Sequence, residues 1–257
     1  MRLHGFFRSG ASHRVRIALE LKGIEYTNSS YVLREGEQRS EAFLRLNPQG
    51  LVPALELDDG RVLTQSLAIC DYLEEVHPEP PLLPQDPVRR AKVRAFAQVI
   101  ACDTHPVQNL KILKRIEALT GSEEAATQWA RQTIEDGLDA CERLIEAEDG
   151  PFCFGDSVTL ADICLVSQMG NARRFGADLR WPRLLAAEAA CNELTAFQRA
   201  APANQPDASR SPLFPDGSQQ CRHRLPRPRH ILPCPPSHSG RAGTCRVTWA
   251  RTRSRAG

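Results

Sequence analysis

The sequence has no run of about 18 apolar residues, and its nine cysteines form no Cys-x-x-Cys pair. A membrane-spanning helix needs about 20 predominantly apolar residues, so we expect no membrane partner. The opening residues, MRLHGFF, are too few and too soon followed by charge for a secretory signal. Scattered cysteines without such a signal are typical of reduced thiols, which predicts a cytoplasmic location.

The last fifth of the chain contains no lysine and almost no acidic residues. After Ala208 the sequence holds ten arginines, no lysine and one acid, Asp216. Removing these from the 33 basic and 31 acidic residues of the whole chain leaves 23 and 30 for residues 1–208, a net charge of −7. The overall charge of +2 therefore says nothing about the partners of the first 208 residues.

Residues 208–257 are also rich in proline, serine and glycine, and they show little apolar periodicity. We predict that this tail is disordered. A nucleic-acid-binding arm is the functional alternative. The interleaved aromatic residues that stack on bases are missing apart from Trp249, so we expect no nucleic-acid partner.

Residues 1–78 predict an α/β domain with the element order β-α-β-α-β-β-α. Ser40 is placed to cap its second helix. Residues 58–60, Asp-Asp-Gly, give the clearest hairpin signal in the chain. The strands are expected near residues 3–7, 26–33, 52–57 and 61–64, and the helices near residues 15–22, 40–46 and 65–75.

A proline-rich stretch, residues 79–87, predicts a linker between two domains. Beyond it the apolar periodicity predicts helices only. The expected fold is therefore α/β followed by all-α, with a helical domain over residues 88–207. Its helices are expected over about residues 88–117, 122–147, 158–173, 182–189 and 191–200.

A short polar loop, residues 8–12, separates the first strand from its helix. Apolar residues at helical spacing follow, with Arg14 and Arg16 between them, and Gly23 predicts the helix end. The loop therefore lies at the positive end of a helix dipole, which favours an anion such as a thiolate. A helix-capping role is the structural alternative for Ser9.

The stretch RSGASHRVRIALELKGI, residues 8–24, resembles the N-terminal signature of the zeta-class glutathione transferases, the maleylacetoacetate and maleylpyruvate isomerases. The resemblance extends from residue 1 to about residue 207. SGASHR and the pair His105-Pro106 are most similar to the bacterial maleylpyruvate branch. Five further segments are similar to the family, in order and at its spacing: NPQGLVPAL (47–55), QSLAICDYLEE (65–75), CDTHPVQNLKIL (102–113), GDSVTLADICL (155–165) and NARRFGADL (171–179).

This resemblance implies a thioredoxin-like glutathione-binding domain over residues 1–78 and a helical glutathione-transferase domain over residues 88–207. It implies glutathione as a cofactor that is not consumed. The implied reaction is cis–trans isomerisation of maleylacetoacetate or maleylpyruvate, both small dicarboxylates, to the fumaryl isomer. That reaction belongs to aromatic catabolism through homogentisate, from tyrosine, or through gentisate. The resemblance also implies a homodimer.

Three residues are expected to be catalytic. The resemblance implies that the Ser9 hydroxyl donates a hydrogen bond to the glutathione sulfur, which lowers the pKa of a thiol. Arg8 and Arg174 are expected to hold the substrate carboxylates, because guanidinium groups match carboxylate geometry. Arg173 is expected to be a solvated surface charge. The animal and plant pattern has Cys where this chain has Ala11, so chemistry that depends on that Cys is in doubt.

The resemblance assigns further residues to glutathione binding. Gln65 and Ser66 stand at a strand-to-helix junction, where the helix N-terminus is expected to hold the γ-glutamyl carboxylate. Gln49 and Val52 match family positions that contact glutathione, and Pro53 matches a cis proline. The structural alternatives are a simple N-cap at the junction and a plain turn over residues 47–50.

His105 and Asn109 are four residues apart, so we expect them to share a helix face. In the bacterial branch of the family this histidine reaches the glutathione or substrate pocket. A partly buried polar contact is the alternative for His105, and the sequence leaves both open. Cys102 and His105 could form half of a metal site, but no second half stands at a suitable spacing, so we expect no metal.

Two other functions stay open. A glutathione transferase that conjugates or dehalogenates small electrophiles would keep Ser9, Gln65 and Ser66 without needing two arginines. A non-catalytic interaction protein with the same fold would be expected to lose Ser9 or Ser66, and both are present. Residues 178–182 depart from the family's Thr-Pro-Tyr-Pro-like turn, so the sequence does not predict the packing near Arg174.

Overall fold

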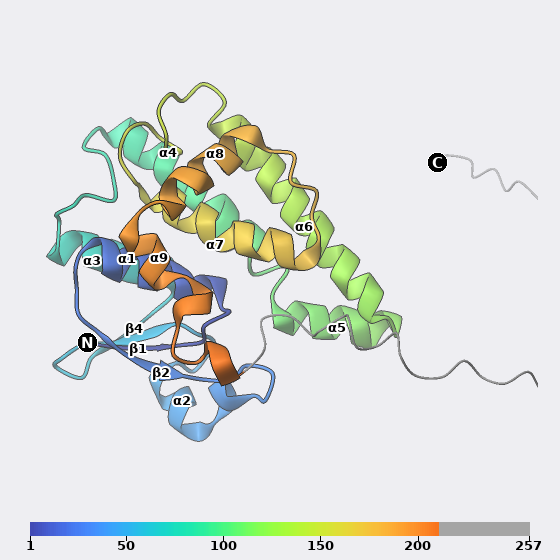
Figure 1. Cartoon of the computed structure of the whole chain (residues 1–257). Coiled ribbons are helices and arrows are strands. Elements are labelled where there is room, and N and C mark those ends of the chain that lie inside the picture. The colour runs from blue at the N-terminus through green and yellow to red at the C-terminus, as the bar shows by residue number, and fades with distance from the viewer. Residues whose placement is uncertain (211–257) are drawn as a thin grey trace, which may run out of the picture. The chain divides into compact units, whose positions relative to one another are not determined.

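The computed structural model describes residues 1–210, and within them an α/β part precedes a helical part (Figure 1). Both parts belong to one unit of the chain. The first contains β1 (Arg2–Gly5), α1 (Gly10–Leu21), β2 (Thr27–Ser30), α2 (Glu41–Leu46), β3 (Ala54–Glu56), β4 (Val62–Thr64) and α3 (Ser66–Val76). The second contains α4 (Pro87–Gln98), α5 (Leu110–Thr120), α6 (Glu123–Leu144), α7 (Leu160–Phe175), α8 (Pro182–Asn192) and α9 (Thr195–Ala200).

The four strands form one sheet in the order β2-β1-β3-β4. β1 and β2 are parallel and are connected through α1, while the pairs β1–β3 and β3–β4 are antiparallel. Helices α1 and α3 cover one face of the sheet, and α2 lies on the other (Figure 1). This is the thioredoxin-like arrangement that the sequence predicts, and it confirms the expected fold class.

Apolar residues fill both faces of the sheet. Leu3 and Leu55 are fully buried on the side of α1 and α3 and join the large core that continues into the helical part. On the other side Phe43 of α2 packs with Phe6, Phe7 and Val52. The loop over residues 8–12 directly follows Phe7, so the smaller cluster holds the start of that loop in place.

The local signals of the α/β part are confirmed. Ser40 Oγ accepts a hydrogen bond from Phe43 N at 3.3 Å, as a helix cap does. Gly60, with φ of +84°, occupies the left-handed region that the turn between β3 and β4 requires. The peptide bond between Val52 and Pro53 is cis. Ile24 N bonds to Leu19 O across the end of α1, which closes that helix at the predicted place.

The prediction of one helix over residues 88–117 is wrong. α4 ends at Gln98, a π-helical turn spans Val99–Thr104, and α5 starts only at Leu110. The π turn depends on packing against α6: Thr104 is buried, and a Cβ built on Gly137 of α6 would lie 2.1 Å from Thr104 Oγ1. Single-turn π bulges of this kind are frequent at functional sites. The turn sets the position of the next residue, His105.

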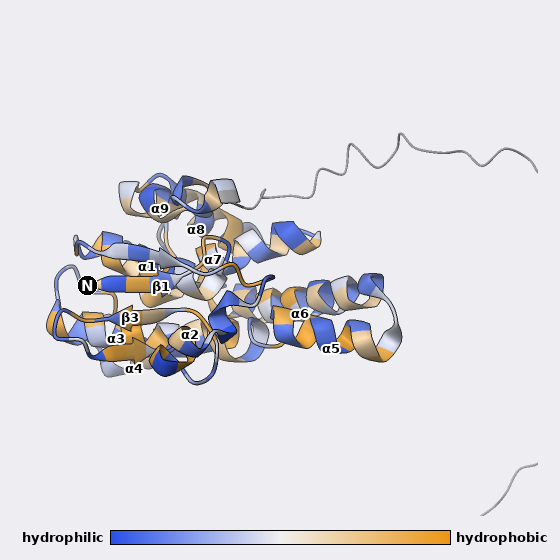
Figure 2. Ribbon diagram, turned by 90° about the horizontal axis from the view of Figure 1, so that it is seen from below, coloured by the Kyte–Doolittle hydropathy of each residue, from blue (hydrophilic) through white to orange (hydrophobic). Residues whose placement is uncertain are grey.

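The α/β part and the helical part meet along α1. This helix packs against α3 on one side and against α7 and α9 on another. Arg16 is buried there, and its Nε donates to Ala200 O of α9 at 3.0 Å. Helices α5 and α6 lie side by side in the helical part (Figure 2). The N-terminal end of α1 is therefore close to residues from both parts of the fold.

Most of the tail predicted over residues 208–257 lies outside the described residues. Its first three residues, Ala208–Arg210, form a short 3-10 helix. Just before them Asp207 accepts a hydrogen bond from Phe7 N at 3.0 Å and another from Ser30 Oγ. No helix among residues 1–210 is long and apolar enough to cross a membrane. The same residues contain no group of three or more His, Cys, Asp or Glu side chains that could hold a metal ion.

Candidate active site

The predicted anion-binding loop lies at the N-terminus of α1. Ser9 caps this helix, and its Oγ accepts a hydrogen bond from Ser12 N at 3.2 Å. Because this bond uses a lone pair of the oxygen, the Ser9 O–H proton remains to donate elsewhere. The capping role and the donor role of Ser9 are therefore compatible.

A second helix N-terminus, that of α3, faces the same region. Gln65 stands at its N-cap with φ of +67°, a strained conformation for a residue other than glycine. The Gln65 side chain donates to Gln49 Oε1 at 2.8 Å. Ser66, the first residue of α3, is buried. Residues from the turn 47–50 and from the strand-to-helix junction thus lie together, as the sequence predicts.

Arg14 connects this helix N-terminus to the helical part of the fold. Its Nε donates to Ser66 Oγ at 3.0 Å, and its Nη2 lies 3.3 Å from His105 Nδ1. The Arg14 side chain is buried, and Nη1 has no hydrogen-bond partner. Burial lowers the pKa of Arg14, and the groups that raise it are cysteine thiols with no carboxylate of residues 1–210 among them. A buried cation without a counter-charge favours an anion nearby.

All ten predicted site residues line one pocket of about 760 Å³. The pocket lies where the loop 8–12, the α3 junction, the π turn and the end of α7 meet. One expectation fails in detail: His105 and Asn109 share no helix face, because Asn109 is the N-cap of α5. The residues in the pocket are Arg8, Ser9, Gln49, Val52, Pro53, Gln65, Ser66, His105, Asn109 and Arg174.

Cations dominate the pocket. Partial burial, then the charges of Arg8 and Arg34, lower the pKa of Arg174 to about 10. Burial and Arg34 likewise lower the pKa of Arg8. Among the described residues that line the pocket, Glu35 is the single acid, while the bases are Arg8, Arg14, Arg34, Arg39, Lys111, Lys114 and Arg174. Such a concentration of positive charge suits a ligand with more than one carboxylate.

Arg173 and Arg174 are neighbours with different environments. Arg173 forms a bidentate pair with Glu188, with both N–O distances at 2.6 Å, and it lies outside the pocket lining. The hydrogen bond to Glu188 raises the pKa of Arg173. The Arg173 side chain is 46% exposed, in agreement with the expected surface charge, and it also neutralises the buried Glu188.

Sequence reasoning missed three residues of the pocket. Arg14 is placed among the charged residues of an amphipathic helix, and nothing local shows that the helix is buried on that side as well. Arg34 stands in a polar loop without a pattern. Asn171 is buried, with Nδ2 unpaired, and this atom would lie 3.1 Å from a Cβ built on Gly10. An invariant polar pattern on α7 would be the signal for Asn171, and a single sequence cannot show one.

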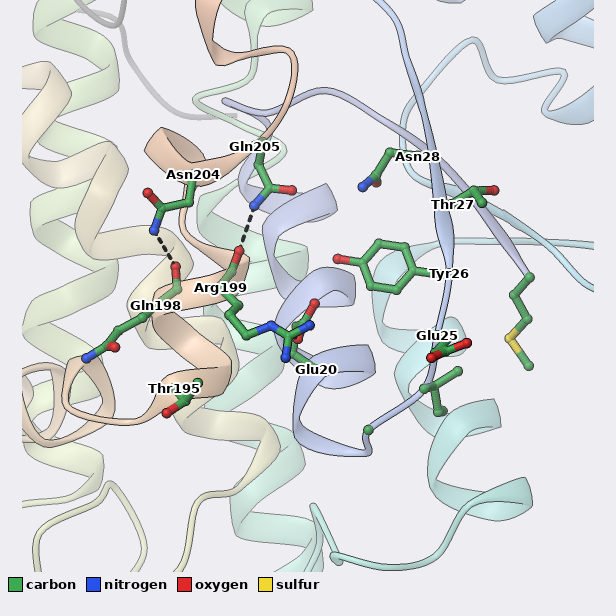
Figure 3. A pocket seen from close by; sticks show the side chains of 13 residues that line it. Glu20, Glu25, Tyr26, Thr27, Asn28, Thr195, Gln198, Arg199, Asn204 and Gln205 are labelled. Carbon is green, nitrogen blue, oxygen red and sulfur yellow. Dashed lines mark hydrogen bonds and ion pairs between the residues drawn. The ribbon is translucent and has the colours of Figure 1, made fainter.

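A second hollow, of about 1060 Å³, lies between the C-terminal end of α1, β2 and α9 (Figure 3). Its polar groups bind one another: Arg199 Nε lies 3.0 Å from a carboxylate oxygen of Glu20, and Gln205 Nε2 donates to Arg199 O at 2.9 Å. None of the predicted site residues lies in it. The first pocket is therefore the candidate active site.

Comparison with known proteins identifies relatives along most of the chain. Residues 8–76 match the glutathione S-transferase N-terminal domain, and residues 111–201 match the glutathione S-transferase C-terminal domain. The chain is 48% identical over 213 residues to a maleylpyruvate isomerase from Ralstonia sp., and the match covers 81% of this chain and 100% of the relative.

Two solved structures show the same similarity. A holo maleyl pyruvate isomerase, a bacterial glutathione S-transferase of the zeta class, is 48% identical with a TM-score of 0.78, and the match covers 80% of this chain and 99% of that one. A maleylacetoacetate isomerase from Methylobacterium extorquens AM1, with bound malonate and glutathione, is 42% identical. Its TM-score is also 0.78, and the match covers 80% of this chain and 98% of that one.

Proposed function

The chain belongs to the zeta class of the glutathione S-transferase family, and on this premise we propose that it is a glutathione-dependent cis–trans isomerase of maleylpyruvate or maleylacetoacetate. The proposed product is the fumaryl isomer, and the proposed role is in aromatic catabolism. The observation that carries this proposal is that the loop 8–12, at the N-terminus of α1, and a cluster of arginines line one pocket. Substrates of this class are dianions, and the pocket supplies cations for both ends.

The residues present fit glutathione. Arg14 contacts Ser66, at the N-terminus of α3, through Nε, and its Nη1 is a buried donor without a partner. These groups would hold the γ-glutamyl carboxylate. Gln65 and Gln49, already in contact, would hold polar groups of the same tripeptide, and Val52, which also lines the pocket, would offer it backbone polar groups. His105 and Asn109 close the pocket from the helical side.

When bound, glutathione would supply a thiolate nucleophile that adds reversibly to the cis double bond of the substrate, so that the resulting single bond can rotate before the thiolate leaves and the double bond forms again. The Ser9 O–H donates toward the sulfur position and stabilises the charged form of the thiol. Arg8 and Arg174 hold the substrate carboxylates and oppose the negative charge that develops on the diketo group during the reaction. Arg34 adds to the same positive field. The absence of Cys at position 11 leaves each of these roles intact.

We further propose the cellular setting and assembly. The six cysteines of residues 1–210 are free thiols, which suits the reducing cytoplasm where glutathione is abundant. A homodimer is proposed because the family is dimeric. Residues 1–78 and 88–207 are proposed as the two domains, with 79–87 as linker, since α3 ends at Val76 and α4 starts at Pro87.

The matched pair Arg174→Gln and Arg173→Gln tests the proposed function. Losing a hydrogen bond to a charged group costs about 1.5–3 kcal/mol, so R174Q should lower kcat/KM for the maleyl substrate roughly 10–150-fold. Glutathione affinity should stay unchanged, because Arg174 is assigned to the substrate. R173Q should lower the melting temperature and leave kcat/KM of the folded enzyme unchanged.

Two results would contradict the proposal. One is glutathione binding without isomerisation of either substrate by the native chain. The other is equal loss of kcat/KM in R173Q and R174Q, because a general loss of folding then explains both. Conjugation of small electrophiles by a chain that isomerises neither substrate would assign it to the conjugating transferases.

A further inference from the structure

The hydrogen-bond roles around Arg14 follow from its chemistry. A guanidinium carries donors only, and it stays protonated in proteins. Ser66 Oγ, 3.0 Å from Arg14 Nε, must therefore accept. His105 Nδ1, 3.3 Å from Arg14 Nη2, must also accept, which requires that its ring carry no proton on Nδ1.

Each of the two groups keeps one proton. Ser66 retains its O–H, and His105 retains Nε2–H as its single ring proton. Both residues line the pocket. The His105 Nε2 atom lies near the loop 8–12, since it would be 3.6 Å from a Cβ built on Gly10. Burial and the Arg14 charge lower the pKa of His105 to about 3, so the ring stays neutral near pH 7.

We propose that Arg14 is a positioning residue that fixes the proton donors of the glutathione site, with Ser66 O–H and His105 Nε2–H both left to donate into the pocket. One side chain from α1 thereby sets a donor on each of the two parts of the fold. The Arg14 guanidinium, whose Nε contacts Ser66 and whose Nη1 is buried and unpaired, adds positive charge where the γ-glutamyl carboxylate would lie. This inference rests on the proposed function, because glutathione is the ligand that these donors would serve.

Arg14→Met tests the inference, and Arg16→Met is the matched control. Both arginines are buried on α1, but Arg16 donates to backbone carbonyls only and lies outside the pocket lining. Two quantities are measured for each variant. One is the dissociation constant of glutathione and of 4-aminobutyryl-Cys-Gly, which lacks the γ-glutamyl α-carboxylate, by titration calorimetry. The other is the tautomer of His105, read from ¹⁵N shifts of histidine-labelled protein without ligand.

R14M should weaken glutathione binding at least tenfold, should leave the affinity for 4-aminobutyryl-Cys-Gly within about twofold, and should turn His105 from the single Nε2–H tautomer into a mixture. R16M should change neither quantity, whatever its melting temperature. Arg14→Lys keeps the charge, and it replaces R14M as the test variant if R14M does not fold. A lysine ammonium is a point charge without a fork, so the tautomer should again become mixed while part of the affinity returns.

An unchanged His105 tautomer in R14M or R14K would overturn the inference, and so would a glutathione affinity within twofold of native. A different result would contradict the proposed function. A native chain that binds no glutathione contradicts the proposed function, and the His105 tautomer, measured without ligand, then still decides on the role of Arg14.

Discussion

Gly137 of α6 is the position at which a single methyl group should disturb the active site from outside the pocket. A Cβ on Gly137 would lie 2.1 Å from Thr104 Oγ1, 3.0 Å from its Cγ2 and 3.1 Å from its Cβ. The Thr104 hydroxyl cannot simply rotate away, because it donates to Val99 O at 2.8 Å within the π turn. Gly137→Ala must therefore move the π turn, and His105 directly follows it.

The expected cost combines two opposing effects. Alanine is favoured over glycine in a helix interior by about 1 kcal/mol, while overpacking a well-packed core typically costs about 1–3 kcal/mol. A contact as short as 2.1 Å belongs at the upper end, so we expect a net loss of about 1–2 kcal/mol. For a chain of this size, each kcal/mol of lost stability lowers the melting temperature by about 2–4 °C.

Gly170→Ala on α7 is the control, because a Cβ there meets no atom within 4 Å. It should raise the stability by up to about 1 kcal/mol. The assay is urea unfolding together with glutathione titration. G137A should be less stable than native and bind glutathione more weakly, and the double variant G137A/T104A should recover part of both. G137A with the stability and affinity of G170A would refute the claim that this packing positions His105.

Three other predictions follow from the charges of the fold. The KM for a dianionic substrate should rise several-fold as ionic strength increases from about 10 mM to about 150 mM, because screening then acts within about 8 Å, whereas the KM for a half-ester should rise less. The Asp162 carboxylate accepts from Cys153 N, Thr159 N and Thr159 Oγ1, each at 2.8 Å, so Asp162→Ala should cost about 2–4 kcal/mol in urea unfolding with glutathione affinity retained. His105 has a folded pKa of about 3 against an ordinary 6.5. Between these two values mainly the unfolded chain takes up this proton. The free energy of unfolding therefore falls as the pH drops, by up to about 1.4 kcal/mol per pH unit. His105→Asn should lose less stability than native between pH 6.5 and pH 5, and equal losses would contradict this pKa.

The sequence predicts those parts of the fold that depend on local chemistry. The Ser40 cap, the Gly60 turn and the end of α1 near Gly23 each follow from the preferences of a few neighbouring residues, and the structure contains them. The break between α4 and α5 is different. It depends on Gly137, more than thirty residues away, which allows α6 to approach Thr104. Pro106 is a local signal for a helix break within residues 88–117, but nothing in that stretch carries the packing against α6 that shapes the π turn.

The candidate site shows the same division. Ser9, Ser66 and Arg174 stand in motifs that a sequence can display, and they meet in one pocket. Arg14 could not be assigned from its own helix, since its burial depends on packing between α1 and the helical part. Arg173 is exposed, as the sequence predicts, but its pairing with Glu188 of α8 does not follow from its own helix. Long-range partners therefore decide which arginines line the pocket and which pair with another helix.

The most direct test of the account is the loss of maleylpyruvate and maleylacetoacetate absorbance with the purified chain, with and without glutathione. The account predicts glutathione-dependent turnover of at least one substrate, and a large preference for one would identify the pathway. No turnover of either substrate by a chain that binds glutathione would contradict the isomerase function.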